Sequence, residues 1–218
     1  ANLHGNLANL YFKMEDYGRS ILHYRKALLL KPSNRQFTEN LNFAYEVAGI
    51  NAKNNKVSIY FGPGSFNYWV VLSFLFGWSG IIIFSYGYFS RWRLKKFIQV
   101  LVFWSLAECV SLFGLYQSEK NELFLQSEVI ALLPDESDEN QSKKEISLRK
   151  FAGAGSSVNT QVNPGESLFL SVDEDNSIRS HKSKDGITWY LANTRDSRKK
   201  GWLAESEIGW VLENKYTD

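Results

Sequence analysis

Residues 87–104, GYFSRWRLKKFIQVLVFW, place four positive charges in the middle of the most apolar region of the chain. The charges belong to Arg91, Arg93, Lys95 and Lys96. Short loops rich in Lys and Arg stay on the cytoplasmic side of a membrane. The apolar stretches on either side therefore decide whether this loop joins two membrane-spanning helices.

Both flanking stretches are long enough to span a bilayer. Residues 66–89, FNYWVVLSFLFGWSGIIIFSYGYF, form a run of 24 without Asp, Glu, Lys or Arg, and residues 97–116 carry one charge, Glu108. At about 1.5 Å per residue the first stretch spans roughly 36 Å as a helix, against about 30 Å of hydrocarbon core. Aromatic residues crowd the ends, as in interfacial belts. The alternative is a pair of buried core helices in a soluble protein, but the pattern favours a transmembrane hairpin over 66–116 with a cytoplasmic loop at 90–96.

The outer flanks of the hairpin carry little positive charge. Lys53 and Lys56 precede the first span, and Lys120 follows the second between Glu119 and Glu122. Both ends of the chain then lie outside the cytoplasm. The sequence predicts a bacterial inner-membrane protein with both termini in the periplasm.

The N-terminal segment 1–50 matches a repeat pattern when Ala1 is taken as the first position of a 34-residue tetratricopeptide repeat. The pattern predicts helices over about 2–14 and about 17–30, with Asp16 capping the second helix and Pro32 following it. Residues 35–48 begin a second unit. The matching large, small, aromatic and proline positions are Leu7, Ala8, Tyr11, Ser20, Tyr24, Ala27 and Pro32.

One repeat and one further helix make a short array, because about three repeats are usually needed to bury the repeat faces. We therefore expect further helices before Ala1, or a partner that covers the exposed side around Phe37, Phe43 and Val47. We interpret residues 51–65 as a linker.

The inner face of the first helix is a candidate binding surface for a protein partner. Asn9 is placed to hold the backbone of a ligand, although these Asn side chains equally fit a role in satisfying neighbouring helices. Gly5 occupies a position where a carboxylate clamp needs a basic residue, so no such clamp is expected. The residues predicted on this partner-binding face are Asn2, Asn6, Asn9, Phe12 and Lys13.

Beyond a second linker at 117–126, residues 127–213 have short strand signals separated by turns, followed by a tail at 214–218. An acidic, poorly hydrophobic insertion occupies 134–145. The pattern predicts a small all-β barrel. The strand candidates are 127–133, 145–150, 167–172, 177–181, 187–193 and 199–206.

Residues 189–211, WYLANTRDSRKKGWLAESEIGWV, resemble the last hairpin of bacterial SH3-like domains. Together with the tetratricopeptide segment and the hairpin, in this order, the chain resembles BatE proteins of the bacterial aerotolerance (Bat) group. The resemblance implies a multidomain membrane protein that acts as a non-enzymatic scaffold in envelope stress or oxygen tolerance. It also implies Bat partners with von Willebrand factor A domains and an indirect link to a MoxR-type AAA+ ATPase.

Four aromatic residues of this barrel, Trp189, Tyr190, Trp202 and Trp210, are candidates for a shelf that binds a proline-rich or cell-wall peptide. Packing in the barrel core is the other interpretation. A barrel that grips peptidoglycan is accordingly the alternative function.

The sequence predicts no enzyme, metal site or cofactor. His4, His23 and His181 are expected to be scattered over different modules. Cys109, the only cysteine, lies in a predicted span, and a single cysteine excludes an intrachain disulfide. The acidic run 135–139 is too irregular for a calcium loop, so we interpret it as a solvated loop. The net charge of +2 gives no concentrated basic face for nucleic acid.

Glu108 is an ionisable group near the centre of a span, where it should face protein or water rather than lipid. A proton relay, docking of a partner's transmembrane helix and simple packing within the hairpin are three possible roles. The predicted contact is between two small or polar helix faces. They comprise Ser73, Gly77 and Gly80 on the first span and Ser105, Glu108 and Ser111 on the second.

Overall fold

The computed structural model describes residues 1–51, 65–90, 93–134, 145–173 and 177–212. The chain divides into two compact units, one made of Ala1–Lys56 with Phe124–Asp218 and the other of Val57–Leu123. The acidic insertion falls almost entirely outside the described residues, as do Arg91 and most of the linker 51–65.

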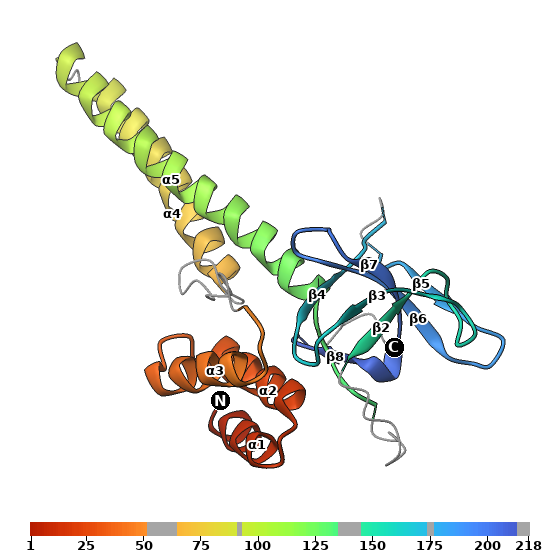
Figure 1. Cartoon of the computed structure of the whole chain (residues 1–218). Helices are drawn as coiled ribbons and strands as arrows, with labels where there is room; N and C mark the ends of the chain where they lie inside the picture. The colour runs from red at the N-terminus through yellow and green to blue at the C-terminus, as the bar shows by residue number, and fades with distance from the viewer. Residues whose placement is uncertain (52–64, 91–92, 135–144, 174–176, 213–218) are drawn as a thin grey trace. The chain divides into compact units, whose positions relative to one another are not determined.

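Three helices begin the first unit (Figure 1): α1 (Asn2–Lys13), α2 (Tyr17–Leu30) and α3 (Arg35–Val47). The Asp16 carboxylate caps α2 by accepting a hydrogen bond from the Arg19 amide at 3.0 Å, as predicted. Asn34 caps α3 in the same way through the Phe37 amide at 3.2 Å. The sequence therefore sets the start of each later helix locally.

Small residues let these helices approach closely. Ala8, Ser20 and Ala27 are fully buried, and the Ser20 hydroxyl donates to the carbonyl of Ala8 at 3.0 Å. Gly5 lies against the ring of Phe37, and a Cβ at this position would overlap that ring. The helix–turn–helix of the repeat and the following helix thus pack as one layer.

An antiparallel sheet forms the rest of the unit, in the order β3-β2-β7-β6-β4-β1-β8, with β5 also paired to β6. The structure shows an antiparallel sheet, and among the described residues no ladder joins β3 to β8 to close it into the predicted small barrel. The elements are β1 (Glu128–Ala131), β2 (Ile146–Arg149), β3 (Val158–Val162), β4 (Ser167–Leu170), β5 (Ser180–Lys182), β6 (Thr188–Thr194), β7 (Lys200–Ala204), the 3-10 turn η1 (Glu205–Glu207) and β8 (Ile208–Trp210).

Strand β1 is buried on both faces. Val129 and Ala131 belong to the core inside the sheet, whereas Ile130 joins the core of the three helices. Leu132 and Val211 also pack into the helical core. The helices and the sheet therefore share buried surface within one compact unit.

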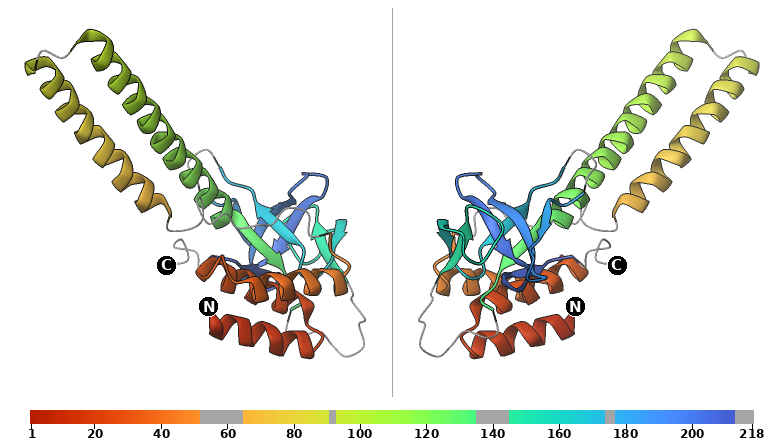
Figure 2. Two further views of the ribbon diagram at one scale, coloured as in Figure 1. Left: turned by 90° about the vertical axis from the view of Figure 1, so that its left-hand side faces the viewer. Right: turned by 90° about the vertical axis from the view of Figure 1, so that its right-hand side faces the viewer.

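The second unit contains α4 (Ser65–Phe89) and most of α5 (Leu94–Ser127), which run side by side (Figures 1 and 2). Each is long and apolar enough to cross a membrane, on length and composition alone. Only 11% of the most apolar window of each helix is buried, whereas core helices of soluble proteins are mostly buried. The interpretation as two buried core helices has no support in this arrangement.

Helix α5 corrects two predicted boundaries. The helix continues through residues 117–126, interpreted above as a linker, because this stretch is rich in Gln, Glu, Lys and Leu and contains no Gly or Pro. It also begins at Leu94, so Lys95 and Lys96 lie in its first turn rather than in the loop 90–96.

Candidate functional site

The exposed side of α1 carries the residues predicted to bind a partner. Asn2, Asn6, Asn9 and Lys13 are exposed, and Phe12 is half-buried. Asn9 is not free, because its side-chain oxygen accepts a hydrogen bond from the Tyr24 hydroxyl at 2.5 Å. One of the three Asn side chains thus serves the packing of α1 on α2, while the others lie open.

Helix α3 extends this surface. Phe43 and Val47 stand one 34-residue period after Asn9 and Lys13, and their side chains are 54% and 42% exposed. The Phe12 ring lies 5.5 Å from that of Phe43, between centroids. We define the α1/α3 face as Asn2, Asn6, Asn9, Phe12, Lys13, Phe43 and Val47. Phe43 and Val47 are thus exposed as predicted, whereas Phe37, predicted on the same side, is buried in the helical core against Gly5.

The sheet covers the other side of the repeat. Arg25 of α2 and Glu128 of β1 form an ion pair whose side chains are 3% and 1% exposed. Close by, Gly18 of α2 approaches Gly165, where a Cβ would lie 2.6 Å from the Ile21 side chain. The sheet therefore covers part of α2, while the residues of the α1/α3 face stay exposed or half-buried in the described part of the chain.

His4 and His23 meet between α1 and α2, which corrects the expectation that the histidines are scattered. Their Nδ1 atoms are 3.0 Å apart, so one ring donates a hydrogen bond and the other accepts it. Tyr11 stacks on His23 at 5.4 Å. Burial lowers the pKa of His23 to about 4, and His4 and Lys26 act in the same direction.

The four aromatic residues of the sheet do not form one shelf. Tyr190 and Trp210 contact each other edge to face at 5.6 Å and pack in the core inside the sheet. Trp189 lies on the opposite face because neighbouring residues of a strand alternate, and it is 2% exposed beneath the Arg149 guanidinium. Trp202, which pairs with Leu191, shares the face of Trp189. The predicted peptide-binding shelf is therefore divided between two faces.

Large rings set into glycines hold α4 and α5 together. Trp104 lies on Gly80, Phe97 on Gly87 and Trp69 on Gly114. A Cβ at any of these glycines would overlap the ring that packs on it. The helices therefore meet through aromatic–glycine contacts as well as through polar ones.

Part of the predicted polar contact is present. The Ser73 and Ser111 hydroxyls are hydrogen-bonded at 2.5 Å. Gly77 has open space around it, and Ser105 donates to the carbonyl of Val102 in its own helix. Glu108 is half-buried, and its Oε2 has no hydrogen-bond partner among the described residues.

The structure describes three of the four predicted topology determinants. Arg93, Lys95 and Lys96 are exposed, and Arg91 lies outside the described residues. Across the described part of the chain, no three His, Cys, Asp or Glu side chains gather where they could hold a metal ion.

Residues 1–34 match the family model of the tetratricopeptide repeat. Neither the curated proteins nor the solved structures give a match to the chain. Tetratricopeptide repeats are typically non-catalytic modules that bind other proteins.

Proposed function

We propose that this chain is a non-enzymatic, membrane-anchored adaptor that holds partner proteins on the α1/α3 face. The observation that carries the proposal is the tetratricopeptide repeat at residues 1–34, whose α2 is covered by the sheet while the α1/α3 face stays exposed. Exposed aromatic and aliphatic side chains bordered by amides are typical of protein interfaces. Phe43 and Val47 supply the apolar part, and Asn2 and Asn6 supply the amides.

The proposed location is a bacterial inner membrane, with α4 and α5 as the two spans and both termini in the periplasm. Support comes from their length and apolar composition and from three basic residues, Arg93 just before α5 and Lys95 and Lys96 in its first turn. The proposed partners are Bat proteins with von Willebrand factor A domains, linked to a MoxR-type ATPase. Support for these partners is the resemblance of the module order to BatE proteins.

Topology is tested by single cysteines at Ser90 and Ser183 in a Cys109→Ser background. An impermeant thiol reagent on intact spheroplasts should label the cysteine at 183 and leave the one at 90 unlabelled until the membrane is permeabilised. Labelling at 90 without labelling at 183 would show the opposite orientation and contradict the proposal of a periplasmic adaptor.

Partner binding is tested by placing a charge on the proposed face. Phe43→Arg should abolish recovery of von Willebrand-domain proteins from detergent-solubilised membranes. The matched control, Phe151→Arg, alters a Phe that is 72% exposed on the sheet unit and should have no effect. Equal recovery with both variants would contradict the proposal. Retention of the purified chain on peptidoglycan sacculi would instead support the alternative function.

A further inference from the structure

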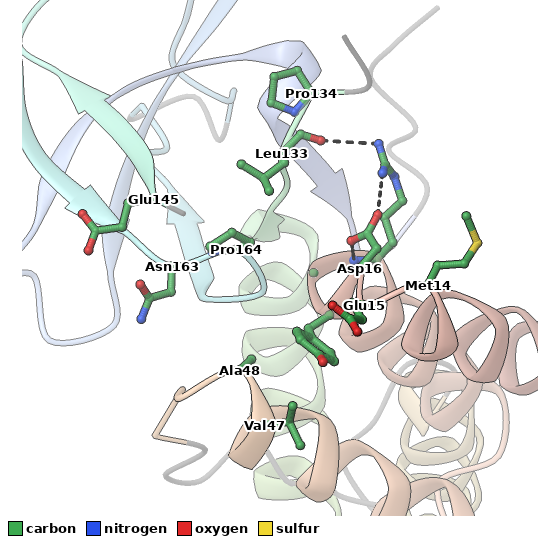
Figure 3. A pocket seen from close by; sticks show the side chains of 13 residues that line it. Met14, Glu15, Asp16, Val47, Ala48, Leu133, Pro134, Glu145, Asn163 and Pro164 are labelled. Atoms are coloured by element: carbon green, nitrogen blue, oxygen red, sulfur yellow. Dashed lines mark hydrogen bonds and ion pairs between the residues drawn. The ribbon is translucent and has the colours of Figure 1, made fainter. Parts of the chain in front are cut away.

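A second surface lies where the helices meet the sheet; it adjoins the α1/α3 face, with which it shares Val47. A pocket of about 740 Å³ opens there (Figure 3). It is lined from five places in the chain: the α1–α2 turn with the start of α2, the end of α3, the segment after β1, the residue before β2 and the β3–β4 turn. Its volume is within the range of about 300–1,000 Å³ found for ligand sites. All of these segments belong to the same compact unit.

The walls of this pocket are partly apolar and partly polar. The apolar part comes from Val47 at the end of α3, Ala48 just after it, Leu133 after β1 and Pro164 in the β3–β4 turn (Figure 3). Val47 keeps 42% of its surface exposed, although it lies beside other apolar groups. Apolar walls of this kind accept an aliphatic or aromatic side chain, or the methylene stem of a long basic one.

The charge of the pocket is negative. Arg19 is its only basic lining residue among those the structure describes, and it is engaged by the Asp16 carboxylate at 2.5 Å and by the carbonyl of Leu133 at 3.4 Å. Glu15 and Glu145 form no ion pair with any described residue. Glu15 stands on the helical side of the pocket and Glu145 on the sheet side (Figure 3). Two uncompensated carboxylates therefore flank the apolar walls.

We propose that this pocket docks an extended segment of a partner protein that carries a Lys or Arg beside an aliphatic or aromatic residue. The basic head reaches Glu15 or Glu145 while its stem and the apolar neighbour lie on Val47, Leu133 and Pro164. Opposite charge supplies the selectivity, since an acidic segment would be repelled by the same two carboxylates. Because the helices and the sheet each supply a wall, the site is complete only while the two are packed together.

The test uses the full chain in nanodiscs of phosphatidylcholine, whose zwitterionic surface attracts basic peptides weakly. Random heptapeptides on phage are selected against it after depletion on empty nanodiscs. The enriched peptides should contain a Lys or Arg next to an aliphatic or aromatic residue. Selection of no peptide, or of peptides without a basic residue, would overturn the proposal.

Variants then assign the selected peptide to the pocket. Glu15→Gln with Glu145→Gln should weaken binding about tenfold, because both variants remove the negative charge that faces the basic head. The control pair Glu39→Gln with Glu205→Gln removes two exposed carboxylates outside the pocket and should leave the affinity unchanged. Equal loss in both pairs, or no loss in either, would contradict the pocket.

The same peptide separates this proposal from the proposed function. Phe43→Arg disables the α1/α3 face and should not change the affinity of the peptide. If Phe43→Arg abolishes peptide binding and the pocket variants do not, the peptide binds the α1/α3 face and the pocket proposal fails. Loss of von Willebrand-domain partners with intact peptide binding would leave the pocket proposal standing.

Discussion

Arg25 of α2 and Glu128 of β1, 103 residues apart in the chain, form an ion pair from which solvent is almost completely excluded. Glu128 is also the first residue after α5, which ends at Ser127. Arg25 thus forms an ion pair with the residue at which the chain passes from α5 into β1. Ile130, on the same face of β1, packs beside it into the helical core.

Removing one member of this ion pair should lower the stability of the protein. Arg25→Met leaves the Glu128 carboxylate buried without its partner, and we expect the free energy of unfolding to fall by about 3–5 kcal/mol. Arg25→Met combined with Glu128→Leu should recover most of that loss, because an apolar pair needs no compensation. Denaturant unfolding of the first unit, followed by tryptophan fluorescence, gives the free energy of unfolding of each variant for a double-mutant cycle. A double variant as unstable as Arg25→Met would show that the pair is not what holds these elements.

Gly201 of β7 should not tolerate a side chain. A Cβ there would lie 2.8 Å from the carbonyl oxygen of Arg149 and 2.8 Å from the Leu148 Cβ, where β2 crosses β7. Since backbone cannot move aside, Gly201→Ala should destabilise the sheet by about 1–3 kcal/mol. Gly155→Ala is the control, because nothing lies within 4 Å of that position. Thermal midpoints that shift equally in both variants would contradict the close crossing.

Acid should weaken the packing of α1 on α2. The pKa of His23 is lowered from an ordinary 6.5 to about 4, first by burial and then by His4 and Lys26. The unfolded state therefore binds the proton more readily, so this contribution to stability is complete above about pH 6.5 and is lost as the pH falls toward 4. His23→Gln should flatten the dependence of the unfolding midpoint on pH in this interval. Titration of the His23 ring signals by NMR with a midpoint near 6.5 would show that the ring is not buried as described.

Cysteines in α4 and α5 should cross-link only at positions that face each other, such as 73 and 111. In a Cys109→Ser background, Ser73→Cys with Ser111→Cys should form a disulfide readily, because the two hydroxyls touch. Gly77→Cys with Ser105→Cys should not, since Gly77 has open space around it and Ser105 bonds its own helix. Mobility on non-reducing gels distinguishes the outcomes, and efficient cross-linking of the second pair would point to a different pairing of the helices.

Local patterns in the sequence account for much of the helical part. The 34-residue period places α1, α2 and the start of α3, and the capping role of Asp16 follows from its position before an apolar run. Most strands are visible as β-branched or aromatic runs between turns. Strand β3, with Asn159, Thr160 and Gln161 at its centre, lacks such a run and escapes prediction.

Contacts between distant segments could not be predicted in the same way. Residues 129–133, VIALL, are apolar without alternation, which is the signature of a strand buried on both faces. This pattern indicates that other elements pack on both faces of β1, but it does not identify α2 as one of them. Nothing in a single sequence links Arg25 with Glu128, or brings the pocket segments together. The division of Trp189 and Tyr190 between two faces likewise needed the strand register.

The Gly80–Trp104 and Gly87–Phe97 contacts fix α4 and α5 in one axial register. A slide of α5 by four residues, about 6 Å along the axis, would bring Trp104 against Phe76 or Phe84 in place of Gly80. The Trp104 ring would then clash with a phenylalanine ring, whereas it now packs on the backbone of Gly80. Piston-like motion of one helix past the other is thereby blocked, and a force applied at one end of the pair is transmitted by tilting or turning both helices together.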